Sequence, residues 1–367
     1  MTRPSTATVY EGVMPDRAVK AQPSTRGSAK LETLTGLRGF AVVVVFVSHA
    51  ANAGFLPRFI GNGVGQLGVM LFFILSGFLM GMLYLEQRPD ALALRRYVTA
   101  RLGRVLPLFY LVVAVSVIAT MAGVVWPFPI TDAPMLAQHL FLLNGTRELW
   151  AVPVEIQFYA IFVLTWLFCQ RQGRLSLTHL ALVFGVLGVA FVAQVLAYHT
   201  DWMTFVTVFY YTPYFLSGML IALARKRIMD HATQMPGWAL TAIAVLAVLA
   251  FVAVNPNFRQ GTALAVPIWA DPLIWAAMVL VFVCSLVGAG PFRWLATGPL
   301  LFLGEISYGF YLLHAIFLKW AEPLAASPSL GARLAVIAGV GLVTAAVAWL
   351  SLTWFERPAL KRAKAMA

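Results

Sequence analysis

Residues 34–53 read LTGLRGFAVVVVFVSHAANA, a mostly apolar run that contains the ionisable residues Arg38 and His49. Its length matches the roughly 20 residues that an α-helix needs to cross the hydrocarbon core of a bilayer. Inside lipid every backbone N–H and C=O group must be satisfied within the protein, and a helix satisfies its own. The run therefore predicts a transmembrane helix that carries two ionisable side chains.

The rest of the chain repeats this apolar pattern. Of the 367 residues 61% are hydrophobic and 11% are charged, whereas soluble domains carry about 25% charged residues. We therefore expect an all-α integral membrane protein, a bundle of about ten transmembrane helices. The predicted spans are residues 34–53, 65–85, 105–125, 150–169, 177–198, 204–224, 237–254, 268–289, 298–320 and 332–353.

The positions of the basic residues predict how these helices are oriented. Of the 26 Lys and Arg residues, 20 lie in the two terminal segments and in alternate loops between the predicted spans. Cytoplasmic segments of membrane proteins are enriched in Lys and Arg, so the asymmetry predicts cytoplasmic N- and C-termini. It also explains the net charge of +12 without a nucleic-acid partner.

The chain divides into a membrane domain and two tails. Residues 1–33 are polar and basic and lack the apolar core of a signal peptide, so we interpret them as a disordered cytoplasmic tail. Residues 34–356 form the membrane domain, and residues 357–367 form a basic cytoplasmic tail. Cys169 and Cys284 both fall near predicted cytoplasmic helix ends, which argues against a disulfide, and no Cys/His spacing indicates a metal site.

Arg38 and His49 are candidate functional residues, because an ionisable group inside a span costs several kcal/mol on insertion scales. They are eleven residues apart, which in a helix is about three turns and places them on one face, about 16 Å apart along the axis. A shared face suggests one polar channel. The alternative is that Arg38 reaches lipid phosphates and His49 meets interfacial water.

Two further segments carry charged residues that are candidates for a functional role. Arg101 and Arg104 project from one face if helical, and guanidinium groups suit phosphate oxygens. An ordinary cluster of positive charge at the cytoplasmic surface is the alternative interpretation. Glu155 follows Trp150 by five residues, which predicts a depth close to that of His49, where a carboxylate can pair with an imidazole.

Two other predicted spans also carry polar residues that are candidates for a functional role. Ser76 lies in a span with small residues at intervals, where it can hydrogen bond across helices or serve packing alone. Tyr308, Tyr311 and His314 recur every three residues and form a stripe on a helix. An aromatic belt at the membrane interface explains the tyrosines. His314 is expected near the depth of His49.

Together these segments resemble the acyltransferase-3 family, bacterial integral-membrane O-acyltransferases, over about residues 34–358. Thr35 departs from the acidic residue that often precedes Leu-Arg-Gly in the family, and Ile156 replaces a second Glu, so that only Glu155 matches. The matching elements, in the family's order, are Leu37-Arg38-Gly39 with His49, the block Gly68–Phe78, Arg101-x-x-Arg104-x-x-Pro107, Trp150 with Glu155 and Phe158-Tyr159, Ser307-Tyr308-x-x-Tyr311-Leu-Leu-His314, and Glu356-Arg357-Pro358.

The resemblance implies an enzyme of the bacterial inner membrane that moves an acyl group, usually acetyl from acetyl-CoA, onto a hydroxyl of a cell-envelope polysaccharide or glycoconjugate. In this interpretation His49 is the general base, Glu155 orients its imidazole, and Arg38 stabilises the oxyanion or holds the donor. Residues expected to bind donor or substrate are Arg101, Arg104, Ser76, Tyr308, Tyr311 and His314.

Some relatives carry an additional extracytoplasmic hydrolase-like domain, whereas this chain ends about ten residues after Pro358. We therefore expect it to modify the acceptor itself or to pass the acyl group to a separate extracytoplasmic transferase. A proton-coupled transporter or flippase of an envelope precursor is the competing interpretation, because buried Arg, His and Glu also form proton relays. The sequence shows no inverted repeat of the kind that many transporters have.

Overall fold

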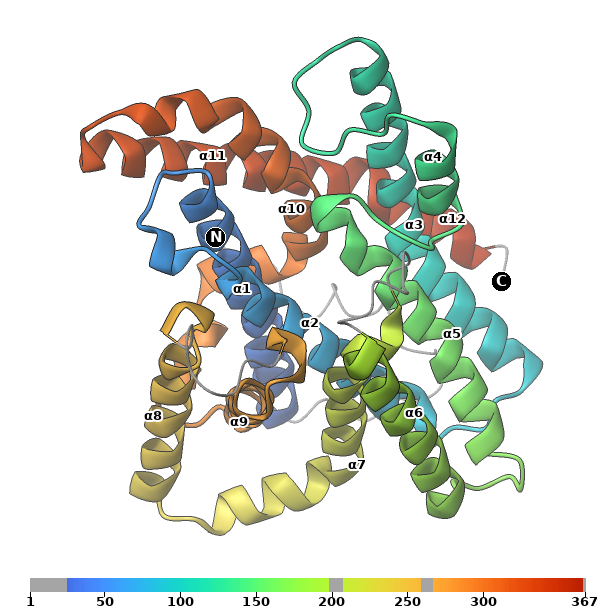
Figure 1. Cartoon of the computed structure of the whole chain (residues 1–367). Helices are drawn as coiled ribbons and strands as arrows, with labels where there is room; N and C mark the ends of the chain where they lie inside the picture. Colours follow the sequence, from blue (N-terminus) through green and yellow to red (C-terminus); the bar gives the residue numbers. More distant parts are fainter. Residues whose placement is uncertain (1–24, 198–206, 259–266, 366–367) are drawn as a thin grey trace, which may run out of the picture.

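The computed structural model describes residues 25–197, 207–258 and 267–365, and these form helices and connecting segments without a strand (Figure 1). Turns of π-helix extend α2 over Gly81–Leu85 and α11 over Leu352–Glu356. The α-helices are α1 (Thr25–Asn52), α2 (Val64–Met80), α3 (Ala91–Met121), α4 (Ala133–Leu140), α5 (Ala151–Cys169), α6 (Leu177–Ala197), α7 (Thr212–Gln234), α8 (Gly237–Ala253), α9 (Pro272–Val287), α10 (Gly298–Ala321), α11 (Leu330–Ser351) and α12 (Arg357–Ala365).

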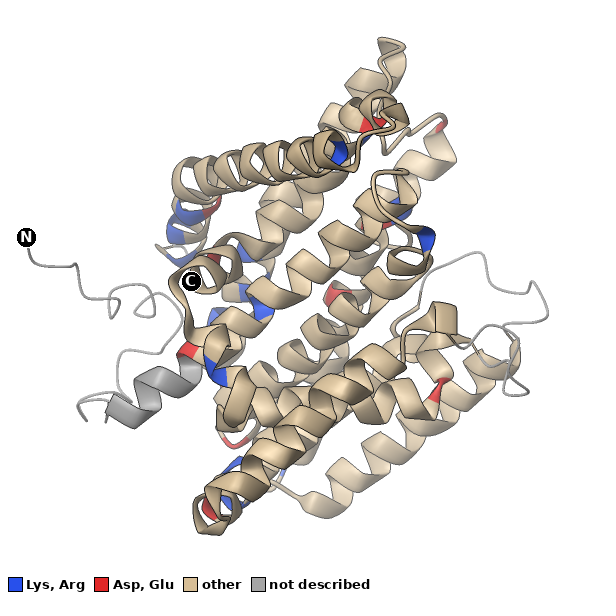
Figure 2. Cartoon of the chain, turned by 90° about the vertical axis from the view of Figure 1, so that its left-hand side faces the viewer, with Lys and Arg blue, Asp and Glu red and all other residues tan. Residues whose placement is uncertain are grey.

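The fold is that of a multi-pass membrane protein. Within the described ranges, 7 helical segments are long and apolar enough to cross a bilayer, or 8 if α9 and the bent segment Gly290–Ala296 form one span. Long stretches of these helices carry no charged residue (Figure 2). Helices are the expected form, because a spanning segment must satisfy its own backbone groups.

The predicted count of about ten spans stays a prediction, and so does the cytoplasmic location of both termini. Of the predicted span 204–224, residues 204–206 lie outside the described residues, and α7 carries Arg225, Lys226 and Arg227. Because these charges lie in the middle of α7, no stretch of bilayer length in it remains apolar. The helix α8 has only 17 residues, and α9 is bent by 70° from the segment that follows it.

Two helices begin more than two turns earlier than their predicted spans. The helix α1 begins at Thr25, while residues 1–24 of the predicted tail lie outside the described residues. The helix α3 begins at Ala91, after Asp90 accepts a hydrogen bond from the Ala93 N–H, so Arg101 and Arg104 lie within it. Charged residues can continue a helix beyond its apolar part, which hydropathy alone does not reveal. The predicted C-terminal tail likewise forms α12, which packs against α3.

Small residues bring the central helices together. The helix α1 packs between α2 and α10, and α2 packs against α7. A Cβ atom on Gly304 of α10 would lie 1.9 Å from the Thr35 carbonyl oxygen, and one on Gly39 would lie 2.2 Å from that of Leu300. The α1–α10 contact therefore has no room for a methyl group at these points. It places the Arg38–His49 face of α1 near the polar stripe of α10.

The helices α1 and α2 run antiparallel. Ser48 Oγ accepts a hydrogen bond of 2.8 Å from the Gly65 N–H, and Gly68 lies against the Ala41 carbonyl. The C-terminal part of α2 therefore lies beside the N-terminal part of α1, so Ser76 lies toward the Arg38 end of α1. His49 lies at the opposite end.

We predict that Gly304→Ala lowers the thermal unfolding temperature of the detergent-solubilised protein by several degrees, because the new methyl group overpacks the α1–α10 contact by about 1–3 kcal/mol. The matched control is Gly188→Ala on α6, where the added Cβ has no atom of the described residues within 4 Å apart from the nearby backbone of its own helix. That change should leave the temperature unchanged or raise it, because Ala favours a helix over Gly by up to about 1 kcal/mol. Equal temperatures for the two variants would contradict the packing argument.

Candidate active site

A cavity of about 100 Å³ lies between α1, α2, α3, α5 and α10. A volume of this size has room for several water molecules. Of the nine site residues predicted from the sequence, this cavity collects all except His49 and His314. Its polar lining consists of Arg38, Ser76, Arg101, Arg104, Glu155, Tyr159, Ser307, Tyr308 and Tyr311.

The cavity has a strongly basic wall. Arg101 is only 8% exposed, and its Nε and Nη2 atoms have no hydrogen-bond partner among the described residues. Its guanidinium carbon lies 5.8 Å from the centre of the Tyr84 ring. Arg38 and Arg104 line the same cavity. Because an uncompensated buried cation costs several kcal/mol, this wall is suited to receive an anion.

Glu155 is held at the Arg38 end of the bundle. Its Oε1 atom accepts hydrogen bonds of 2.8 Å from the Ser76 hydroxyl and 2.5 Å from the Tyr159 hydroxyl. The expectation that Glu155 pairs with the imidazole of His49 is wrong, because the carboxylate beside that imidazole is Glu148. The two glutamates are seven residues apart, about 10 Å or two helical turns. The predicted span began at Trp150 and so left Glu148 outside the helix, whereas the turn Arg147–Trp150 leads directly into α5.

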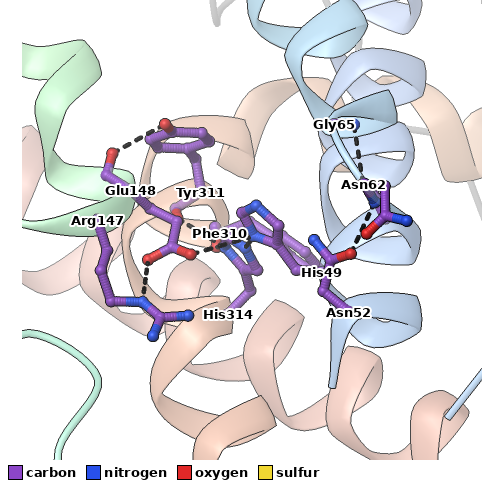
Figure 3. Close-up of polar contacts among 10 residues, drawn as sticks. His49, Asn52, Asn62, Gly65, Arg147, Glu148, Phe310, Tyr311 and His314 are labelled. Atoms are coloured by element: carbon purple, nitrogen blue, oxygen red, sulfur yellow. Dashed lines mark hydrogen bonds and ion pairs between the residues drawn. The ribbon is translucent and has the colours of Figure 1, made fainter. Parts of the chain in front are cut away.

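His49 belongs to a second polar cluster (Figure 3). Its Nδ1 atom lies 2.7 Å from Nε2 of His314 and 3.6 Å from Oε1 of Glu148. The other carboxylate oxygen of Glu148 lies 3.6 Å from Nε of Arg147. His314 is fully buried, whereas the His49 side chain is 26% exposed. The sequence prediction that His314 lies near the depth of His49 is confirmed.

The segment that carries Glu148 is fixed by short-range contacts. The buried His139 bonds the Met135 carbonyl through Nδ1, and its Nε2 accepts a hydrogen bond of 2.9 Å from the Thr146 N–H. Arg147 then adopts a left-handed backbone conformation with φ of 49°. The Glu148 carbonyl accepts a hydrogen bond from the Tyr311 hydroxyl, and Tyr311 also lines the cavity, so this side chain connects the two polar centres.

Sequence reasoning missed Glu148, Arg147 and His139. The available signal was the adjacent pair Arg147-Glu148, which lies two residues before Trp150 at the boundary of a predicted span. The tyrosine positions were predicted, but their bonding was not: the Tyr308 hydroxyl donates to the Val105 carbonyl of α3 at 2.5 Å. Both cysteines are buried and free. In the described part of the chain no three His, Cys, Asp or Glu side chains are grouped as metal ligands.

Comparisons with known proteins identify the family to which the chain belongs. Residues 31–353 match the sequence model of an acyltransferase domain, and the chain belongs to the acyltransferase-3 family. It is therefore an acyltransferase that transfers groups other than aminoacyl groups, which decides against the transporter interpretation.

Three relatives illustrate the similarity. ExoZ of Rhizobium meliloti (strain 1021), an exopolysaccharide production protein, is 28% identical over 319 residues, 82% of this chain and 92% of ExoZ. BcsY of Komagataeibacter xylinus is 28% identical over 364 residues, 89% of this chain and 82% of BcsY. The O-acetyltransferase OatA of Staphylococcus aureus is 27% identical over 165 residues, 39% of this chain and 26% of OatA. No solved structure matches the chain.

We predict that His139→Leu lowers the thermal unfolding temperature, because the Thr146 N–H loses its acceptor and an unsatisfied buried donor costs about 1–3 kcal/mol. Released from His139, the segment with Glu148 should also become more accessible to proteases. The matched control is His231→Leu on α7, an exposed histidine that among the described residues bonds only the Arg227 carbonyl. If His139→Leu unfolds no earlier than the control, His139 does not hold this segment.

Proposed function

We propose that this protein is an O-acyltransferase of the bacterial inner membrane that moves an acetyl group from cytoplasmic acetyl-CoA onto a hydroxyl of a cell-envelope polysaccharide or glycoconjugate. The observation that carries the proposal is the cavity with the buried Arg101 on its wall, whose Nε and Nη2 atoms have no hydrogen-bond partner among the described residues. The name of ExoZ, an exopolysaccharide production protein, supports a polysaccharide acceptor, and the name of the O-acetyltransferase OatA supports transfer of an acetyl group to oxygen.

The donor is an elongated molecule with phosphates at one end and a thioester at the other. Its phosphates would bind Arg101 and Arg104, because guanidinium groups pair with phosphate oxygens through charge-assisted hydrogen bonds. Its thin arm would follow the cavity past Glu155, which can accept hydrogen bonds from the amide N–H groups of the arm. Arg38 lies about 16 Å from His49 along α1, and this distance favours donor binding over stabilisation of an oxyanion at His49.

The acceptor would react at the His49 end of the bundle. The partly exposed imidazole of His49 is accessible to a hydroxyl group that approaches from outside the bundle. His49 takes the hydroxyl proton while the hydroxyl oxygen attacks the thioester carbonyl carbon. The C–S bond then breaks, and the leaving thiolate takes the proton from the imidazolium. Glu148, 3.6 Å from Nδ1, offsets the transient positive charge of the imidazole.

In the proposed orientation the membrane separates the acyl donor from the acceptor. With both termini in the cytoplasm, Arg101 and Arg104 face the compartment that supplies acetyl-CoA, and His49 faces the envelope side. The acetyl group crosses inside the protein while the donor and the acceptor stay on opposite sides. Direct transfer to the sugar and transfer through a separate extracytoplasmic transferase both fit this arrangement.

We predict that acetyl-CoA raises the thermal unfolding temperature of the purified protein, since a ligand at 100 times its Kd stabilises the folded state by about 2.7 kcal/mol. Arg101→Met should abolish most of this shift, because the phosphates lose a buried cation. The matched control, Arg227→Met on the exposed part of α7, should retain the full shift. A wild-type protein that acetyl-CoA does not stabilise would refute the proposed donor.

We also predict that cells carrying His49→Ala make envelope polysaccharide without the acetyl esters that the wild-type protein adds, measured by alkaline release of acetate from purified polysaccharide. The purified variant should still be stabilised by acetyl-CoA, because His49 does not line the donor cavity. Normal acetylation in the variant would remove His49 from the mechanism.

A further inference from the structure

We infer that His314 is a positioning residue that holds His49 in the tautomer with a proton on Nδ1, so that the Nε2 lone pair of His49 faces the acceptor as the base. This inference rests on the proposed function, and it assigns to His314 a role other than donor binding. It follows from the hydrogen-bond geometry around the two rings.

The protonation of His314 is set by its own helix. Its Nδ1 atom lies 2.7 Å from the Tyr311 carbonyl oxygen and 3.2 Å from the Phe310 carbonyl oxygen. Carbonyl oxygens only accept hydrogen bonds, so Nδ1 of His314 must carry a proton. A neutral imidazole has one N–H, and its other nitrogen is then an acceptor. His314 is fully buried, which favours this neutral form, so its Nε2 is an acceptor.

That acceptor determines the tautomer of His49. The two rings are nearly parallel, at 13°, with centres 5.0 Å apart. Because Nδ1 of His49 is only 2.7 Å from Nε2 of His314, the rings meet edge to edge through these two nitrogens. An acceptor on His314 requires a donor on His49, so Nδ1 of His49 carries the proton. The Nε2 atom of His49 is then unprotonated, and it makes no hydrogen bond to the rest of the described chain.

The other charged groups around His49 are consistent with this assignment. Glu148 faces Nδ1 from the turn before α5, and a carboxylate also favours a proton on that nitrogen. Arg147 lies on the far side of Glu148 and balances its charge. On α10, Phe310 and Tyr311 pack against the His314 ring and restrict its rotation. The base therefore has a fixed direction before the acceptor arrives.

The test compares two substitutions that differ in one property. His314→Gln keeps an acceptor oxygen near the place of Nε2, whereas His314→Leu is similar in size and has no acceptor. We expect His314→Leu to lower kcat for acetyl transfer by about 10²- to 10³-fold, in the range that general base catalysis contributes. His314→Gln should recover at least tenfold of this loss. Both variants should keep the acetyl-CoA stabilisation of the wild-type protein.

A spectroscopic measurement checks the tautomer directly. Nitrogen NMR of the ¹⁵N-histidine-labelled wild-type protein should show His49 with a protonated Nδ1 and an unprotonated Nε2, and His314→Leu should shift His49 toward the other tautomer. Equal kcat values for the Gln and Leu variants, or a wild-type His49 protonated on Nε2, would overturn the inference. If the wild-type protein neither binds acetyl-CoA nor transfers acetyl, the proposed function fails instead, and the tautomer measurement still decides the role of His314.

Discussion

The close contact between α1 and α10 is the constraint on which the rest of the site depends. At Gly39 and Gly304 the backbone of one helix lies against a carbonyl oxygen of the other, with no room for a side chain. This approach allows His49 and His314 to meet at hydrogen-bond distance. It also places Arg38 and Tyr308 on the wall of one cavity. With larger residues at these two glycine positions, α1 and α10 would lie farther apart. His49 would then move away from His314, and Arg38 from Tyr308.

The same two helices carry two polar centres rather than one. Near Arg38 the carboxylate of Glu155 accepts hydrogen bonds from two hydroxyl groups. Two guanidinium nitrogens of Arg101 are buried in the cavity wall without a hydrogen-bond partner in the part of the chain that the structure describes. Near His49 the imidazole pair is supported by Glu148. A reaction that needs both a polyanionic donor and a general base can use this separation, because the donor's charge then stays away from the base. Tyr311 belongs to both centres, since it lines the cavity and bonds the Glu148 carbonyl.

Much of this arrangement could be predicted from sequence because lipid makes ionisable residues conspicuous. Arg38 and Glu155 are unusual within apolar runs, and both line the cavity. Arg101, predicted just before a span, lines the same cavity. The pairing of the carboxylates could not be predicted, although the start of α5 was predicted to within one residue. Glu148 lies in the short turn Arg147–Trp150 before α5, where the apolar pattern gives no information on which side chains face the bundle. The early start of α3 was missed for a related reason, since charged residues extend a helix without adding to its apolar run.

The departure from the family pattern at Ile156 does not leave His49 without a nearby carboxylate, because Glu148 lies beside it. The sequence places an apolar residue where relatives often have a second glutamate, which leaves one acidic residue in that motif. The carboxylate beside His49 comes instead from position 148, where His139 and Tyr311 fix the backbone on either side. Because His314 supplies the contact that sets the tautomer, Glu148 at 3.6 Å need only supply charge, a role that tolerates distance better than a hydrogen bond does. In the proposed mechanism, orientation of the base comes from His314 and charge comes from Glu148, so His49 needs no carboxylate in direct contact.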